Sequence, residues 1–138
     1  KPNMEGFDEN YTYIELYDSA TDTFYDEKLL KDVDLNTVNN QNKWYDYENN
    51  IWANIKTTAN GKEAWWVWVP RYAYYLEPAT KEVEIIFVDL NDKPLNKEKY
   101  GNKLPSNFKV HTAFTPSGSD GSKNLQGIWM AKYEASDS

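Results

Sequence analysis

Six aromatic rings lie within thirteen residues at Ala64–Leu76, and this stretch, AWWVWVPRYAYYL, limits the possible folds more than any other. Aromatic and β-branched residues favour strands, and alternate residues of a strand share one face. One face of the predicted strand carries Trp66, Trp68, Pro70, Tyr72 and Tyr74, and the other carries Trp65, Val67, Val69, Arg71, Ala73 and Tyr75. Because proline cannot donate to a sheet ladder, Pro70 predicts an edge, a bulge or a break at this point.

The row of rings has two interpretations. In the first it is a platform on which sugars or an extended peptide stack, with Arg71 as the polar anchor. The stacking residues would then be Trp66, Trp68, Tyr72 and Tyr74. In the second, which we favour, the sheet is buried on both faces, and Arg71 is held by a carboxylate or by ring faces. Arg71 is the only arginine of the chain, and its planar fork suggests a specific and structural role.

The remaining sequence predicts a mainly β to α+β fold, built as antiparallel sheet with long irregular loops. Residues 1–10 form an irregular lead-in, and residues 11–138 form a single compact β-rich domain. Aromatic flanks around a polar turn predict a hairpin at Tyr11–Lys28, and a similar arrangement recurs at Lys43–Lys56. Between them, Leu29–Asn42 begins as a helical turn and continues as a loop or short strand.

Two further strands are expected in the second half of the chain. Glu82–Leu90 is rich in β-branched residues, and Leu125–Ser136 forms the last strand. Pro94, Gly101 and Pro105 punctuate a long connection after the first of them, and Thr115–Asn124 is a loop. Amphipathic helical spacing is nowhere sustained for three turns.

Composition narrows the classes of partner. The chain has 138 residues, no cysteine and a formal net charge of -7. An acidic domain repels polyphosphate and anionic lipid, so we expect neither nucleic acid nor a membrane surface as a partner. No run approaches the roughly 20 apolar residues of a membrane span, so no membrane insertion is expected. The absence of cysteine excludes disulfides, a thiol nucleophile and thiolate metal sites.

Residues typical of catalysis are scarce, and we predict that the chain is not an enzyme. His111 is the only histidine and lacks a partner motif, so it is interpreted as a partly buried, hydrogen-bonded side chain. Asp32–Asn36 begins like a calcium loop, but Thr37 stands where such a loop needs glycine, which favours a solvated turn. No cofactor or metal is expected. The many carboxylates leave glycosidase chemistry open, which would require a pair about 5–9 Å apart in a cleft.

Three segments together resemble one family. WWVWVPRYAYYL at Trp65–Leu76, VHTAF at Val110–Phe114 and GIWMAKYEAS at Gly127–Ser136 are similar, in this order, to motifs of surface and phage-tail-associated proteins of Firmicutes. Trp44–Asn54 resembles the lead-in of that family, some members of which begin with a pilin-like signal. The resemblance spans roughly Lys43–Ser136. Thr112 departs from it, because the family pattern has proline there.

The last of these segments also resembles a strand of formylglycine-generating-type domains, which implies a partial C-type-lectin-like fold. The cysteines of that enzyme are missing here, so its oxidase chemistry is not implied. The chain also ends where such a domain continues.

These observations predict a non-enzymatic extracytoplasmic domain, a structural or adhesive part of a bacterial surface protein or filament. Its ligand would be a glycan or a surface protein, and it would be located outside the cell or on the cell surface. The alternatives are a prophage tail or receptor-binding module in a virion, a pilin-like subunit that polymerises through edge strands, and a glycosidase.

Overall fold

The computed structural model describes residues 1–18, 21, 23–41, 43–116 and 124–134. Chain contacts divide it into two compact units. Unit 1 comprises Lys1–Val69 and Trp129–Ser138, and unit 2 comprises Pro70–Ile128. Both are built on antiparallel sheet with short helical turns, so the predicted mainly β fold is confirmed. The predicted single domain over residues 11–138 therefore contains two sheets with separate cores.

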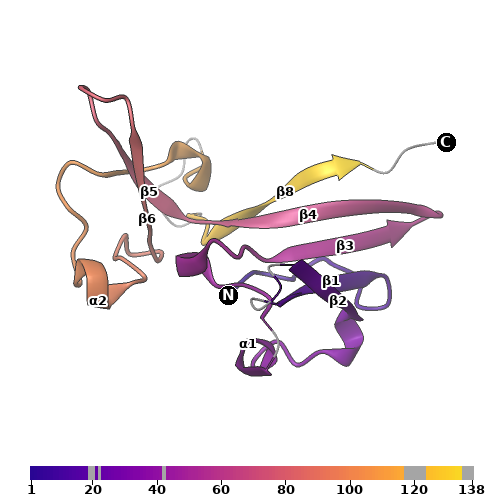
Figure 1. Ribbon diagram of the computed structural model, residues 1–138. Coiled ribbons are helices and arrows are strands. Elements are labelled where there is room, and N and C mark those ends of the chain that lie inside the picture. The colour runs from indigo at the N-terminus through magenta and orange to yellow at the C-terminus, as the bar shows by residue number, and fades with distance from the viewer. Residues whose placement is uncertain (19–20, 22, 42, 117–123, 135–138) are drawn as a thin grey trace. The chain divides into compact units, whose positions relative to one another are not determined.

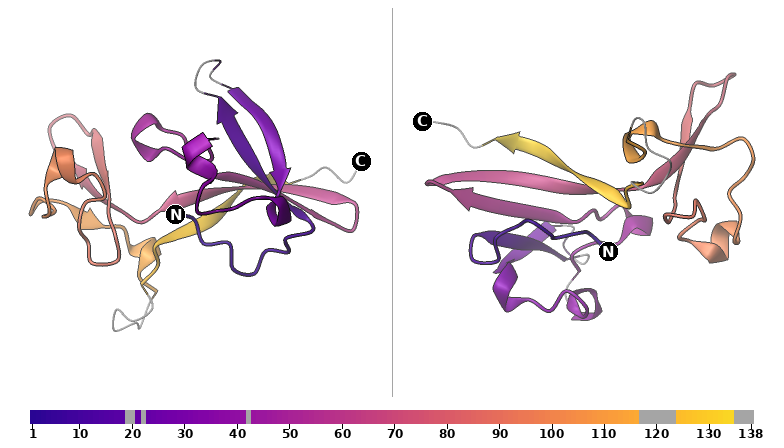
Figure 2. Two further views of the ribbon diagram at one scale, coloured as in Figure 1. Left: turned by 90° about the horizontal axis from the view of Figure 1, so that it is seen from below. Right: turned by 180° about the vertical axis from the view of Figure 1, so that it is seen from behind.

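A five-stranded sheet, in the order β2-β1-β3-β4-β8, forms the frame of unit 1 (Figure 1). Its strands are β1 (Thr12–Asp18), β2 (Thr23–Leu29), β3 (Asn54–Ala59), β4 (Lys62–Pro70) and β8 (Gly127–Glu134). The hairpin predicted at Tyr11–Lys28 is confirmed as β1 and β2, with a register shift between Leu16 and Tyr17. β3 and β4 form a second hairpin, and β8 runs beside β4 (Figure 2).

Short helical segments connect these strands. They are η1 (Leu30–Asp32), α1 (Val38–Gln41) and η2 (Tyr47–Asn49). The helical turn predicted after β2 is confirmed as η1, but the loop or short strand predicted at its end is wrong, because α1 occupies that position. At Lys43–Lys56 the expected hairpin is only partly formed. Asp46 and Ile51 bridge across η2, and the strand β3 begins only at Asn54.

The core of unit 1 is large and mostly aliphatic and aromatic. Its buried members are Ile14, Leu16, Val38, Trp44, Ala53, Ile55 and Trp68. The lead-in at residues 1–10 contains no strand or helix, as predicted, yet it packs against this core through Met4 and Phe7. The Trp129 indole N–H donates to the Asn3 carbonyl at 2.7 Å, which fixes the lead-in beside β8.

Unit 2 contains a three-stranded sheet in the order β6-β5-β7. The strands are β5 (Tyr72–Leu76), β6 (Val83–Phe87) and β7 (Lys109–Val110), and the helical segments are α2 (Lys97–Tyr100) and η3 (Thr112–Phe114). β6 confirms the strand predicted at Glu82–Leu90, and β8 confirms the last strand as far as Glu134. The loop predicted at Thr115–Asn124 falls mainly on residues 117–123, outside the described residues.

Candidate functional site

The aromatic row does not lie on one strand. β4 ends at Pro70 and β5 begins at Tyr72, so the predicted break at Pro70 is confirmed. Trp66 and Trp68 belong to the five-stranded sheet, whereas Tyr72 and Tyr74 belong to the three-stranded sheet. The continuous face expected from alternation along a single strand is therefore wrong, since alternation holds only within each strand.

The two tryptophans of the row serve the core of unit 1. Trp68 is only 5 % exposed, and its ring meets Trp129 edge-on at 5.2 Å. Trp66 is half-buried against the same core, and its indole N–H donates to the Thr57 hydroxyl at 3.0 Å. Trp68 thus has no ring face open to a ligand, in line with the second interpretation above.

Arg71 is buried as well, and it joins four segments of unit 2. Its Nε and Nη2 atoms donate to Asp92 Oδ1 at 3.1 and 2.8 Å. Its Nη1 atom donates to the carbonyls of Phe114 and Leu125 at 3.2 and 3.4 Å. The backbone N–H of Arg71 donates to Gln126, and its carbonyl accepts from Val88. A guanidinium used in this way holds the fold together and cannot anchor a ligand, so the predicted anchoring role does not fit this structure.

His111 is partly buried and hydrogen-bonded, as predicted. Its Nδ1 atom accepts from the Ala113 N–H at 3.0 Å, which caps η3. Its ring lies 5.5 Å from Tyr72 and 5.8 Å from Tyr74. The side chain therefore belongs to a ring cluster rather than to a catalytic pair.

One face of the β5–β6 hairpin is apolar and open, and we call it the apolar face. Its residues are paired across the strands as Tyr72 with Phe87, Tyr74 with Ile85, and Leu76 with Val83. Leu76, Val83 and Ile85 are 48 %, 57 % and 45 % exposed. The opposite face carries Ala73 and Ile86, which are buried in the core of unit 2. An exposed apolar patch on a folded sheet is typical of a surface that binds another protein.

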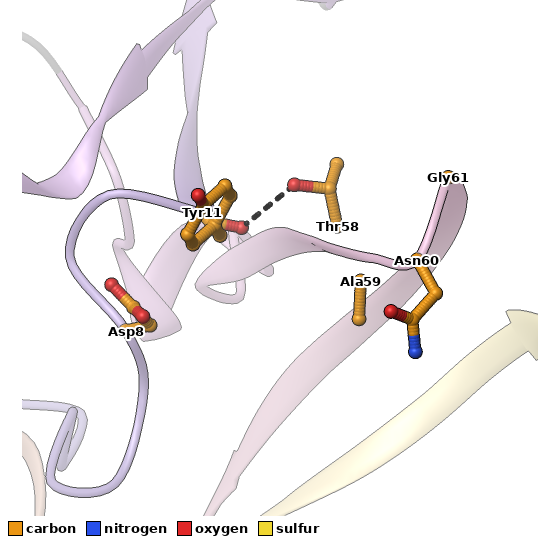
Figure 3. Close-up of a pocket in the computed structure, with 6 residues that line it drawn as sticks. All are labelled: Asp8, Tyr11, Thr58, Ala59, Asn60 and Gly61. Atoms are coloured by element: carbon orange, nitrogen blue, oxygen red, sulfur yellow. Dashed lines mark hydrogen bonds between the residues drawn. The ribbon is translucent and has the colours of Figure 1, made fainter.

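A second candidate site is a groove in unit 1, lined by Asp8, Tyr11, Thr58, Ala59, Asn60 and Gly61, with a volume of about 630 Å³ (Figure 3). Two segments form its walls, the lead-in before β1 and the turn between β3 and β4. None of these residues was predicted as a site. The Asn-Gly pair between two strands was an available signal, because Asn-Gly is the commonest sequence of a two-residue hairpin turn.

The structure offers no metal centre among the residues it describes: no three His, Asp or Glu side chains converge on one point there. Asp34 lies in a polar turn and accepts from the Asn36 N–H at 2.9 Å, which confirms a turn at the calcium-like sequence. No helix in the described part of the chain is long and apolar enough to cross a membrane.

Comparison of the chain with protein-family models, curated proteins and solved structures finds no match.

Proposed function

We propose that this chain is a non-enzymatic structural and adhesive domain of a bacterial surface protein, and that it binds a protein ligand by adding a strand to β6. The observation that carries the proposal is the outer, partly apolar edge of β6 at Val83 and Ile85, beside the apolar face. Strand addition uses backbone hydrogen bonds for affinity and alternate side chains for specificity. The sequence resemblance to surface proteins supports the extracellular setting.

The unpaired backbone groups of β6 follow from its register with β5. Glu77 N–H donates to the Glu82 carbonyl and Val88 N–H donates to the Arg71 carbonyl, both at 2.9 Å. Hydrogen-bonded pairs alternate with non-bonded pairs in antiparallel sheet, so Val83 and Ile85 direct their N–H and C=O groups away from β5. Among the described residues, no strand lies on that side of β6.

The outer edge is open over a short length only. The Phe87 carbonyl already accepts from the Leu95 N–H at 2.9 Å, and Val88 bridges to Pro94. A partner strand therefore has space beside Val83 and Ile85 but not beyond Phe87. Such an edge fits a short extended segment better than a long strand.

The negative charge beside the outer edge of β6 limits which peptide can bind there. Glu84 lies between Val83 and Ile85, Glu82 precedes them, and both carboxylates are exposed. The pKa of the Tyr75 hydroxyl is raised, and the largest cause is its hydrogen bond to Glu77. Burial and the negative charges of Glu77 and Glu84 raise this pKa further. This edge is thus acidic, and opposite charges stabilise cross-strand pairs. The fitting ligand is an extended segment in which Lys or Arg alternates with apolar residues.

A second copy of this chain fits the edge poorly. A two-fold pairing centred on Glu84 places two glutamates directly opposite each other, and like charges in that position are destabilising. A pairing centred on Ile85 places Val83 opposite Phe87, where Leu95 already occupies the carbonyl. We therefore assign the edge to a different polypeptide.

The test uses three labelled, end-blocked pentapeptides and fluorescence anisotropy. The first is Thr-Val-Lys-Val-Lys, the second has Glu in place of both Lys, and the third is the first with both Val amides N-methylated. We expect binding of the first, at least about tenfold weaker binding of the second, and none of the third, because it lacks the backbone donors. Equal binding of the first and third peptides, or no binding of the first, would overturn the proposal.

The matched protein variants are Ile85→Lys and Leu90→Lys. Both residues belong to unit 2 and have exposed aliphatic side chains of the same size, at 45 % and 40 % exposure. Only Ile85 lies on β6. We expect Ile85→Lys to abolish binding of the first peptide and Leu90→Lys to leave it unchanged. Equal loss in both variants would show that the peptide binds apolar surface in general.

A further inference from the structure

The groove of unit 1 is held open by hydrogen bonds between its two walls. The Tyr11 carbonyl accepts from the Thr58 N–H at 2.9 Å and from the Thr58 hydroxyl at 3.3 Å, the second of which is drawn in Figure 3. The Tyr11 N–H donates to the Asp8 carbonyl at 3.1 Å. These bonds fix the backbone of Tyr11 relative to the β3–β4 hairpin, so the backbone of both walls is already in place before a ligand binds.

The second wall is a tight turn with little freedom. Ala59 pairs with Lys62, and Asn60 and Gly61 between them have φ values of 54° and 76°. Both residues are left-handed, as a type I′ turn requires. At Gly61, a lining residue, the space where a Cβ would stand has no atom within 4 Å, so no side chain crowds this point.

The groove combines a ring face with polar groups that have no partner in the described part of the chain. Tyr11 is 58 % exposed, and its hydroxyl forms no hydrogen bond there. Asp8 uses Oδ1 to accept from the Asn10 N–H at 2.9 Å, which leaves Oδ2 open. The Asn60 amide has both donors and an acceptor unused. Figure 3 shows these side chains on the two sides of the groove.

This set matches the chemistry of a sugar ring. A saccharide presents an apolar face of C–H groups, which packs on an aromatic ring, and an edge of hydroxyls that both donate and accept. Asp8 accepts from hydroxyls, and the Asn60 amide does both. The volume of about 630 Å³ lies within the range of roughly 300–1,000 Å³ that is typical of ligand pockets.

Charge excludes one class of saccharide. Asp8 is the one carboxylate among the residues that line the groove, and the chain as a whole carries a formal net charge of -7. An anionic sugar would be repelled by both, whereas a neutral sugar would not. We propose that the groove at Asp8, Tyr11 and Asn60 binds a neutral saccharide, with the Tyr11 ring as the stacking face. This site lies in unit 1 and the apolar face lies in unit 2, so each proposal can fail without the other.

The experiment is a titration of the ¹⁵N-labelled chain with methyl glycosides of glucose, galactose, mannose and N-acetylglucosamine, followed by amide chemical shifts. Glucuronic acid is the anionic comparison. We expect at least one neutral glycoside to shift the amides of Asn60 and Gly61 in a saturable manner, with glucuronic acid weaker. No saturable shift with any neutral glycoside, or tighter binding of glucuronic acid, would overturn the proposal.

Variants separate the ring from its hydroxyl and from general surface effects. Tyr11→Ala is expected to weaken binding about tenfold or more, whereas Tyr11→Phe keeps the ring and most of the affinity. Phe24→Ala is the matched control, because Phe24 is another exposed ring, at 46 %, on β2. Equal weakening in Tyr11→Ala and Phe24→Ala contradicts the assignment.

A second variant keeps the test valid if Tyr11→Ala does not fold. Asn60→Gly removes the amide but retains a residue that adopts positive φ without strain. Its binding is expected to weaken severalfold, with the unfolding midpoint little changed. Unchanged affinity in Asn60→Gly would contradict the proposal.

Discussion

The two units are stabilised in different ways. Unit 1 buries Trp44, Ile14, Leu16 and Ile55 completely, in a core that spans its five-stranded sheet. Among its described residues, the cluster of unit 2 buries the smaller side chains of Ala73, Ile86 and Val88, and outside this cluster the unit buries Phe114 and the charged side chain of Arg71. A small unit with few large apolar side chains gains less from burial. In unit 2 the hydrogen bonds of Arg71 to the surrounding loops then supply part of the stability that apolar packing supplies in unit 1.

The largest expected effect tests the apolar side of this comparison. Trp44 is fully buried, and its indole N–H donates to the Asn54 carbonyl at 3.2 Å. We expect Trp44→Ala to lower the free energy of unfolding by about 3–5 kcal/mol, because it leaves a cavity and an unpaired carbonyl. Amide hydrogen exchange should show the loss of protection in β1, β3 and β4. Trp44→Phe should cost less, and equal losses in both variants would contradict a cavity as the cause.

The next effect tests the polar side. Arg71→Lys keeps the charge but loses the planar fork that reaches Asp92 and two carbonyls. We expect it to destabilise unit 2 by about 2–4 kcal/mol, since a lysine buried at this position cannot reach Asp92 and both carbonyls at once, and its charge is left poorly compensated. Hydrogen exchange of β5 and β6 amides measures it. Asp92→Asn retains an oxygen acceptor and should cost less. A loss below about 1 kcal/mol in Arg71→Lys would show that the apolar cluster suffices for unit 2.

The smallest effect concerns pH. Burial raises the pKa of Glu15 on β1; Lys132 opposes this shift, whereas Glu27 adds to it. A carboxyl group with a raised pKa in the folded chain stabilises the fold below its ordinary pKa of 4.5, and this contribution is lost as pH rises through the raised value.

Glu15→Gln should therefore stabilise the chain near neutral pH and give no gain in acid. Because the side chain is only partly buried, we expect less than about 1 kcal/mol. Thermal unfolding at about pH 3 and about pH 7 measures the difference, with the wild type compared at each pH. A gain of the same size at both values would show that charge is not the cause.

The positions of the strands could largely be predicted from the sequence, whereas the sheet to which each aromatic residue of Ala64–Leu76 belongs could not. Alternation and turn residues gave β1, β2, β6 and β8, because these depend on local pattern. Pro70 was interpreted correctly as a break, but which sheet each side of the break joins depends on long-range pairing. This is why Trp68 and Tyr74, six residues apart, have different environments.

The candidate sites divide in the same way. Tyr72 and Tyr74 were predicted as site residues, and they lie on the apolar face. Val83 and Ile85 complete this face only because of the register of β6 on β5. The groove joins Tyr11 to Asn60 across 48 intervening positions of sequence, through the pairing of β1 with β3. A single sequence contains no direct signal for such a contact.

Glu84 has a further consequence for handling the chain. The segment Val83–Phe87 is a short, apolar edge strand, and segments of this kind seed cross-β aggregates when several copies align in register. In such a stack every Glu84 would lie against another, at the spacing of about 4.8 Å between neighbouring strands. One acidic side chain in the middle of the strand therefore acts as a gatekeeper against fibrils, while leaving the edge open to a basic ligand.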